Sequence, residues 1–412
     1  MNNALKWHVL VGGFLAYMFD AVEISVLAIS LPSIRRMVGL SLFQGGMLAT
    51  ASWIGIGVSG LAMGIVADTY GRRRALLMSL AVFGAATFAF AFSGSSFLLM
   101  LFLRLLAGLG LGAVWATLAA YVAETWPAQF RGRATLWVLS SYPVGAGLAA
   151  AIGGYLLPDW QGVFMWCGAA AVIPMIYIFL FIPESPAWVA DTLARNSNDA
   201  QHSEESRSAP ILEIFSGDLL RQTVFGTAAA TFALFAYIGL LTWLPSYLAV
   251  ERGLSLVTVS HYVIVFNVGV FVSYFLFGLV ADAFGERRAL LVSLIGASVM
   301  LLIYSTIIDS SVLLWISPLM GVFIVFSGLM GSYFSQIYPI HIRTTGAGFC
   351  FNVGRGIASF SPLLTASIAT SVGLSFALMV CAAIFLLSAA SVLCLPRGVS
   401  KFKLPLSKPV EL

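Results

Sequence analysis

Charged residues are scarce in this chain of 412 residues. Asp, Glu, Lys and Arg together make up 9% of it, whereas soluble domains carry roughly a quarter. Hydrophobic residues make up 60%. A chain of this composition is not a soluble globular protein, and we expect a polytopic membrane protein in contact with a lipid bilayer.

Several sequence motifs are also missing. The chain has no P-loop, no glycine-rich nucleotide motif, no H-E-x-x-H and no nucleophile elbow. We therefore expect neither an ATP-driven pump nor an enzyme, with no catalytic residue, no cofactor, no metal and no nucleic-acid partner. The four cysteines lie in apolar runs without metal-ligand spacing, which indicates packing residues.

Apolar runs long enough to cross a bilayer, at roughly 20 residues each, occur twelve times. They cover residues 9–31, 43–66, 75–95, 97–121, 134–157, 162–182, 222–249, 258–280, 289–308, 312–335, 346–370 and 373–395. The polar stretch "ADTLARNSNDAQHSEESRSAP" separates the sixth run from the seventh. We predict an all-α membrane protein with one six-helix bundle over 1–186, a linker over 187–217, a second bundle over 218–396 and a tail over 397–412.

The basic residues predict the orientation in the membrane. If the N-terminus is cytoplasmic, 16 of the 21 Lys and Arg residues fall on the cytoplasmic side and three fall in external loops. Arg104 and Arg355 lie inside apolar runs. By the positive-inside rule, we expect both termini in the cytoplasm of a cell whose inner membrane holds the protein.

The two predicted bundles resemble each other. "GIVADTYGRRRAL" begins at Gly64 and "GLVADAFGERRAL" at Gly278, while "ETWPAQFRGRA" begins at Glu124 and "QIYPIHIRTTG" at Gln336. The two pairs are offset by 214 and 212 residues and occupy equivalent loops. Repeated six-helix halves are typical of many secondary transporters.

These motifs resemble the major facilitator superfamily. Its loop motif G-x-x-x-D-x-x-G-R-R-R is met from Gly64 to Arg74, and "RLLAGLGLGA" in the fourth run, "PESP" after the sixth and "GAGFCFNVGRG" in the eleventh add to the likeness. The resemblance covers nearly the whole chain outside the linker and tail. It implies two pseudo-symmetric six-helix bundles around a central cavity, and it is greatest to proton symporters for sialate, aromatic acids and other organic acids.

One motif of the superfamily's antiporters is not met. They often carry G-P-x-x-G-G in the fifth helix, where this chain reads "SSYPVGAGLAAAIGGYLLP". This difference favours symport.

Two acids and an arginine stand out in the first half. Asp20 and Glu23 are three residues apart and share a helix face, and at roughly 1.5 Å per residue Arg104 lies at a similar depth. Buried charges are costly in a bilayer and usually face a partner or a cavity. We predict that Asp20, Glu23 and Arg104 couple transport to protons, with Asp20 as the proton carrier; a permanent ion pair that only joins helices is the alternative.

Arg355 is the corresponding charge in the second half, and Asn352 precedes it by one turn. Arginine binds carboxylates through a planar fork, so we predict an anchor for an anionic substrate; the alternative is a structural ion pair. Further substrate-binding candidates are Tyr17, Trp115, Tyr142, Tyr237, Trp243 and Asn267.

The loop motifs predict a gate on the cytoplasmic side. Its candidate residues are Asp68, Gly71, Arg72, Arg73, Glu124, Arg131, Asp282, Arg287 and Arg343. We expect their contacts to close the cavity on that side when it faces outward.

The sequence thus predicts a secondary active transporter, monomeric, that moves a small organic anion with a proton by alternating access. A uniporter or antiporter for a sugar, drug or other metabolite stays an alternative. So does a nutrient sensor on the same fold that has lost transport.

Overall fold

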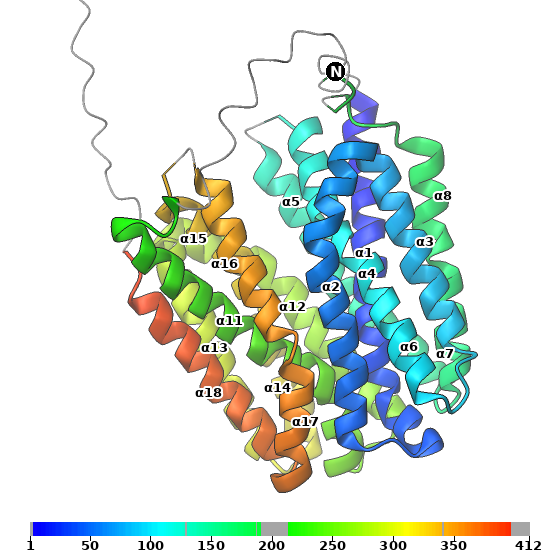
Figure 1. Ribbon diagram of the computed structural model, residues 1–412. Helices are drawn as coiled ribbons and strands as arrows, with labels where there is room; N and C mark the ends of the chain where they lie inside the picture. Colours follow the sequence, from blue (N-terminus) through cyan, green and yellow to red (C-terminus); the bar gives the residue numbers. More distant parts are fainter. Residues whose placement is uncertain (1–2, 128–129, 187, 191–212, 340–341, 397–412) are drawn as a thin grey trace, which may run out of the picture.

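The computed structural model describes residues 3–127, 130–186, 188–190, 213–339 and 342–396, and its helices form two groups (Figure 1). The first group contains α1 (Asn3–Val38), α2 (Leu42–Tyr70), α3 (Arg72–Phe90), α4 (Phe97–Thr125), α5 (Arg131–Leu139), α6 (Ser141–Leu156), α7 (Trp160–Ala170) and α8 (Val172–Phe181). We call this group the first half.

The second half consists of the helices after the linker. They are α11 (Gly217–Ser246), the π-helix η3 (Tyr247–Glu251), α12 (Leu256–Phe284), α13 (Glu286–Thr306), α14 (Ser310–Val322), α15 (Phe326–Ile337), α16 (Arg343–Ala358), α17 (Ser361–Val372) and α18 (Leu374–Leu393). Most of the predicted linker and all of the predicted tail lie outside the described residues.

The twelve predicted spans are confirmed, but five of them consist of two helical pieces. These are α5 with α6, α7 with α8, α11 with η3, α14 with α15, and α16 with α17. Ten helical stretches of the described chain are long and apolar enough to cross a membrane; α2 and the pair α16 and α17 complete the fold. Hydropathy alone does not predict these breaks, because both pieces of a span are equally apolar.

The two halves meet mainly at one end. We call the end that carries Arg72, Arg131, Arg287 and Arg343 the basic end, and the end that carries Arg36 the opposite end. Toward the opposite end α12 packs along α6 and α17 packs on α2, and the halves separate toward the top of Figure 1, which is the basic end.

Small residues allow the close packing toward the opposite end. A Cβ added to Gly46 of α2 would lie 2.8 Å from the carbonyl oxygen of Pro362, in the first turn of α17. A Cβ added to Gly154 of α6 would lie 2.9 Å from the Cβ of Ser260 on α12. The halves therefore approach each other through backbone contacts that a larger side chain would prevent.

Candidate functional site

A cavity between the two halves brings together Asp20 and most of the predicted substrate-binding residues. We call it the Arg355 cavity. Its lining consists of Tyr17, Asp20, Ile24, Trp53, Ile56, Leu111, Gly112, Trp115, Leu139, Tyr142, Leu234, Tyr237, Tyr274, Ser327, Phe351 and Arg355. The centre of a water molecule has about 130 Å³ to occupy there. One water needs roughly 10–15 Å³ by this measure, so the space admits several waters or a small molecule.

Asp20 and Arg355 give this cavity its charge. Among the described lining residues Asp20 of α1 is the one acid and Arg355 of α16 the one base. Asp20 is 7% exposed, and Arg355 lines the same space from the other half. The guanidinium carbon also lies 5.0 Å from the centre of the Phe351 ring. A positive and a negative group from different halves therefore face one buried space, where electrostatic interactions are strong.

Aromatic rings form much of the wall. The ring centre of Tyr17 lies 5.3 Å from that of Trp115 and 5.5 Å from that of Tyr142. On the other side Tyr237 packs edge-on against Phe326 at 5.6 Å. Their faces and hydroxyl groups present a surface that is apolar with a few polar points, as in many small-molecule sites.

Glu23 has a different partner from Asp20. Its Oε1 accepts a hydrogen bond of 2.8 Å from Nη1 of Arg104, and the two side chains are 3% and 1% exposed. Nη2 of Arg104 donates to the Thr87 hydroxyl at 3.3 Å. The guanidinium carbon lies 4.6 Å from the Phe90 ring centre and 5.1 Å from that of Phe164. Both members of this pair belong to the first half. This is the arrangement expected if Glu23 and Arg104 form a permanent ion pair that only joins helices, the alternative to a role in proton coupling.

Of the two acids, Glu23 is the one that contacts Arg104, while Asp20 lines the Arg355 cavity. Residues three apart on a helix are offset by roughly 60° around its axis, and this offset turns Asp20 toward Arg355 while Glu23 turns toward Arg104. The acid that lines the cavity with Arg355 comes from the first half.

Three predicted substrate-binding residues lie outside the Arg355 cavity. Trp243 is fully buried, and its indole N–H donates to the carbonyl oxygen of Pro362 at 3.0 Å, so it joins α11 to α17. Asn352 is exposed and lines no described cavity; Phe351 occupies the wall one turn before Arg355 instead. Asn267 lines a second cavity, and its amide donates to the Val263 carbonyl at 2.8 Å.

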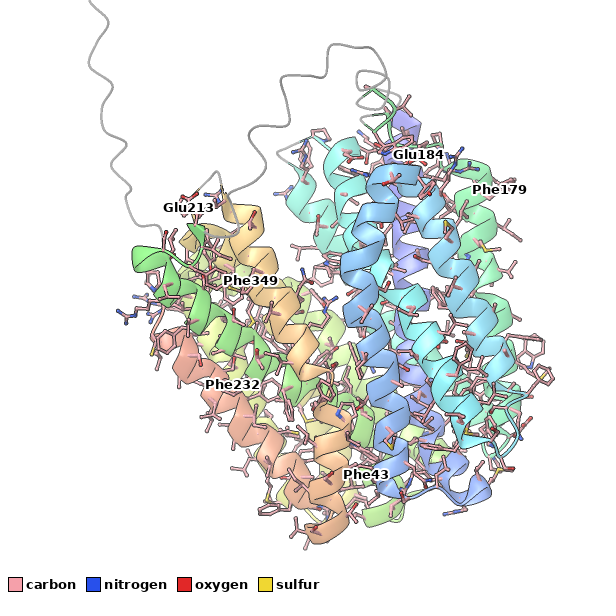
Figure 2. All side chains as sticks on the ribbon, in the orientation of Figure 1. Phe43, Phe179, Glu184, Glu213, Phe232 and Phe349 are labelled. Carbon is pink, nitrogen blue, oxygen red and sulfur yellow. The ribbon has the colours of Figure 1, made fainter. Side chains whose placement is uncertain are left out.

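Four of the predicted gate residues, Gly71, Arg72, Arg73 and Glu124, form a connected group at the basic end. Nη2 of Arg72 lies 3.3 Å from Oε1 of Glu124, and Nη1 donates to the Ala67 carbonyl at 2.7 Å. The backbone N–H of Arg73 donates to the Glu184 carboxylate at 3.0 Å. Figure 2 shows Glu184 at this end, and Phe43 at the opposite end where the halves meet. All these contacts lie within the first half, so in this conformation they join α2, α3, α4 and the segment after α8.

Gly71 forms the turn between α2 and α3 in this group. Its φ of 102° is one that L side chains rarely adopt, and it ends α2 and starts α3. A Cβ at this position would collide with the Glu184 carboxylate. Glycine therefore lets the carboxylate reach the positive N-terminus of α3.

The remaining gate candidates make other contacts. Nε of Arg131 donates to the Trp126 carbonyl at 2.9 Å, and Nη2 of Arg287 donates to the Leu393 carbonyl at 2.9 Å. Asp282 and Arg343 are exposed. Asp68 lies in α2, but its side chain is outside the described part of the chain.

Five polar or aromatic residues at these sites were not among the candidates that the sequence offers. Trp53, Tyr274, Ser327 and Phe351 line the Arg355 cavity, and Glu184 caps α3. Aromatic and hydroxyl residues are common in every span, so no pattern separates these from residues that face lipid. Glu184 lies within the "PESP" motif, so the resemblance to the superfamily drew attention to this segment but did not predict the contact with Arg73.

Comparisons with known proteins agree with this architecture. The profile of the family described as Major Facilitator Superfamily matches residues 13–271. A cis,cis-muconate transport protein of Acinetobacter baylyi is 28% identical over 375 residues, with 89% of each chain covered. A 3-(3-hydroxy-phenyl)propionate transporter of Escherichia coli is 28% identical over 357 residues, covering 85% of this chain and 84% of the relative. A crystal structure of a D-xylose-proton symporter superposes with a TM-score of 0.76 at 17% identity, covering 97% of this chain and 99% of that chain.

Proposed function

Because this chain belongs to the major facilitator superfamily, we propose that it is a secondary active transporter that moves a small organic carboxylate together with a proton. The observation that carries this proposal is the pair of Asp20 and Arg355, which come from different halves and line the same cavity. A multi-pass membrane transporter with one acid and one arginine in its central space has a group for the proton and a group for the anion.

Arg355 is the proposed anchor for the substrate carboxylate. Its guanidinium stays positively charged under all physiological conditions and offers a planar pair of donors that fits a carboxylate. The aromatic rings around it would hold the apolar part of the substrate. Tyr17, Trp115, Tyr142 and Tyr237 retain their proposed roles in binding, since all four line the cavity.

Asp20 is the proposed proton carrier. A carboxylate at Asp20 competes with the substrate carboxylate for the charge of Arg355, because both are anions in one small space. Protonation of Asp20 removes that competitor, so the proton and the organic anion bind together. Glu23 is then the residue that keeps Arg104 neutralised while Asp20 changes its charge, a division of roles that rests on the 2.8 Å contact between Glu23 and Arg104.

The transport cycle requires the halves to exchange their contacts. In the described conformation the halves pack toward the opposite end and separate toward the basic end. Breaking the packing of α17 on α2 would open the opposite end. We propose that the protein works as a monomer in the inner membrane, with both termini and therefore the basic end in the cytoplasm.

The names of the relatives agree with an organic acid as substrate. Muconate and 3-(3-hydroxyphenyl)propionate, which these relatives are named for, are compact carboxylic acids with an unsaturated or aromatic body. Both would fit an arginine surrounded by aromatic rings. The identity of the acid transported by this chain follows from the experiment below.

Purified protein in liposomes tests the proposal directly. Uptake of radiolabelled organic acids is measured with the interior alkaline, with no pH gradient, and with a proton ionophore. Accumulation that requires the gradient supports symport. Equilibration without accumulation would identify a uniporter, and binding without any transport would identify a sensor.

A further inference from the structure

A second cavity lies beyond the Arg355 cavity, toward the opposite end. We call it the Arg104 cavity, because Arg104 and Glu23 line it together with Ser25, Thr242 and Asn267. Water centres have about 50 Å³ to occupy there, enough for a few molecules at roughly 10–15 Å³ each.

The spans agree on the order of the two cavities. On α11 Tyr237 lines the Arg355 cavity and Thr242, five residues nearer the opposite end, lines the Arg104 cavity. On α12 the corresponding residues are Tyr274 and Asn267, and the chain there runs in the other direction. The two cavities are therefore stacked along the axis between the halves.

Four apolar residues line both cavities. They are Ile24 of α1, Trp53 and Ile56 of α2, and Leu111 of α4. A residue that contributes to two cavities has atoms on both sides of the wall between them. We call this group the partition, and all four of its members belong to the first half.

We propose that the partition, with Trp53 as its largest member, is the floor of the substrate site and sets the length of the acid that the transporter accepts. A carboxylate held by Arg355 directs the rest of the substrate into the space bounded by this floor. The partition also separates the two ionic centres, because Asp20 and Arg355 lie on one side and the pair of Glu23 and Arg104 on the other. The inference about substrate length rests on the proposed function, whereas the separation of the cavities does not.

Removal of the Trp53 side chain should join the two cavities. An acid with a longer apolar tail then reaches the space beside Thr242 while its carboxylate stays on Arg355. Burial of an added methylene group favours binding by about fourfold. The Trp53→Ala variant should thus prefer a longer acid in a series such as benzoate, 3-phenylpropionate and 5-phenylpentanoate, shifting the ratio of affinities by about fourfold for each methylene that enters the new space.

A labelling experiment tests the wall without any substrate. Thr242→Cys is introduced into the full chain, and its reaction rate with a charged methanethiosulfonate reagent is measured in otherwise unchanged protein and in Trp53→Ala. The parent chain without the added cysteine reports the reaction of the native thiols. We expect the rate at residue 242 to rise at least tenfold when Trp53 is replaced.

Two controls isolate the partition. Trp115→Ala removes the same side chain from a residue that lines the Arg355 cavity but not the Arg104 cavity, and it should leave the labelling of Thr242→Cys unchanged. Ser327→Cys, which also lines only the Arg355 cavity, should react at the same rate with or without Trp53. Leu111→Ala, a smaller change in the partition, provides a second variant if Trp53→Ala does not fold.

The two readouts separate failure of this inference from failure of the proposed function. If Thr242→Cys reacts at the same rate in the otherwise unchanged protein, in Trp53→Ala and in Leu111→Ala, the partition does not separate the cavities and the inference is wrong. Faster labelling with an unchanged order of acid affinities would support the wall but overturn its role in setting the length of the acid, whereas absence of acid binding and uptake in the unchanged protein would overturn the proposed function. A changed order of affinities without faster labelling would also overturn the partition, since longer acids would then be held elsewhere.

Discussion

Asp20 and Arg355 lie more than 300 positions apart in the chain and line one cavity from opposite halves. Glu23, one turn from Asp20 on the same helix, instead contacts Arg104 at 2.8 Å. Two acids that look equivalent in the sequence therefore have different surroundings. One faces a space with room for a substrate, and the other is held in a closed ion pair of the first half.

The Asp20→Asn variant should lose accumulation driven by a pH gradient but retain counterflow. The amide has the size of the protonated acid and cannot release a proton, whereas counterflow needs only loaded carrier to change conformation. Both activities are measured in the same liposomes. If Asp20→Asn still accumulates substrate against its gradient, Asp20 is not the proton carrier.

Arg355→Lys should weaken substrate binding by about ten- to hundredfold. A lysine retains the charge but loses the planar fork, and a hydrogen bond to a charged group contributes about 1.5–3 kcal/mol. Thermal-shift titration with organic acids measures the affinity. Arg36→Lys is the matched control, since Arg36 is exposed at the opposite end; unchanged affinity in both variants would make Arg355 structural.

Removing one member of the buried pair of Glu23 and Arg104 should destabilise the protein. Removing one partner of a buried ion pair leaves an uncompensated charge and costs about 3–5 kcal/mol. We expect Arg104→Met to lower the thermal unfolding temperature strongly, and the double variant with Glu23→Gln to regain most of the loss. Double and single variants of equal stability would show that the pair is not held as described.

Glu124→Gln should alter the rate of exchange and leave substrate affinity unchanged. Glu124 contacts Arg72 at the basic end, where the predicted cytoplasmic gate lies. The variant should therefore change the equilibrium between the two conformations of the transport cycle. Affinity is measured by thermal shift and exchange by counterflow. A loss of affinity at normal exchange would contradict a gating role.

Gly71→Ala should destabilise the protein by about 1–3 kcal/mol. Its φ of 102° and ψ of 157° fall in a region that is essentially restricted to glycine, and the new methyl group would collide with Glu184. Gly278→Ala is the control, because Gly278 lies within α12 and a Cβ there meets open space. Equal unfolding temperatures for both variants would show that the turn at Gly71 adapts to a side chain.

The sequence by itself determined the membrane class, the twelve spans and the charges of interest. Long apolar runs predict membrane spans. Charged residues within such runs are rare because they are costly in a bilayer, so they are easily recognised in the sequence. Asp20, Glu23, Arg104 and Arg355 could therefore be selected without a structure. Their roles in transport stay predictions.

Only the tertiary structure decided which charges face each other and which aromatic residues line the cavity. The acid that lines the cavity with Arg355 comes from the other half of the chain, and nothing in the local sequence around Arg355 encodes that arrangement. Tyr237 lines the cavity while Trp243, less than two turns further along α11, packs against Pro362. A transmembrane helix is apolar on every face, whether the face lies toward lipid, toward a neighbouring helix or toward a cavity. Hydrophobic periodicity therefore does not distinguish these faces.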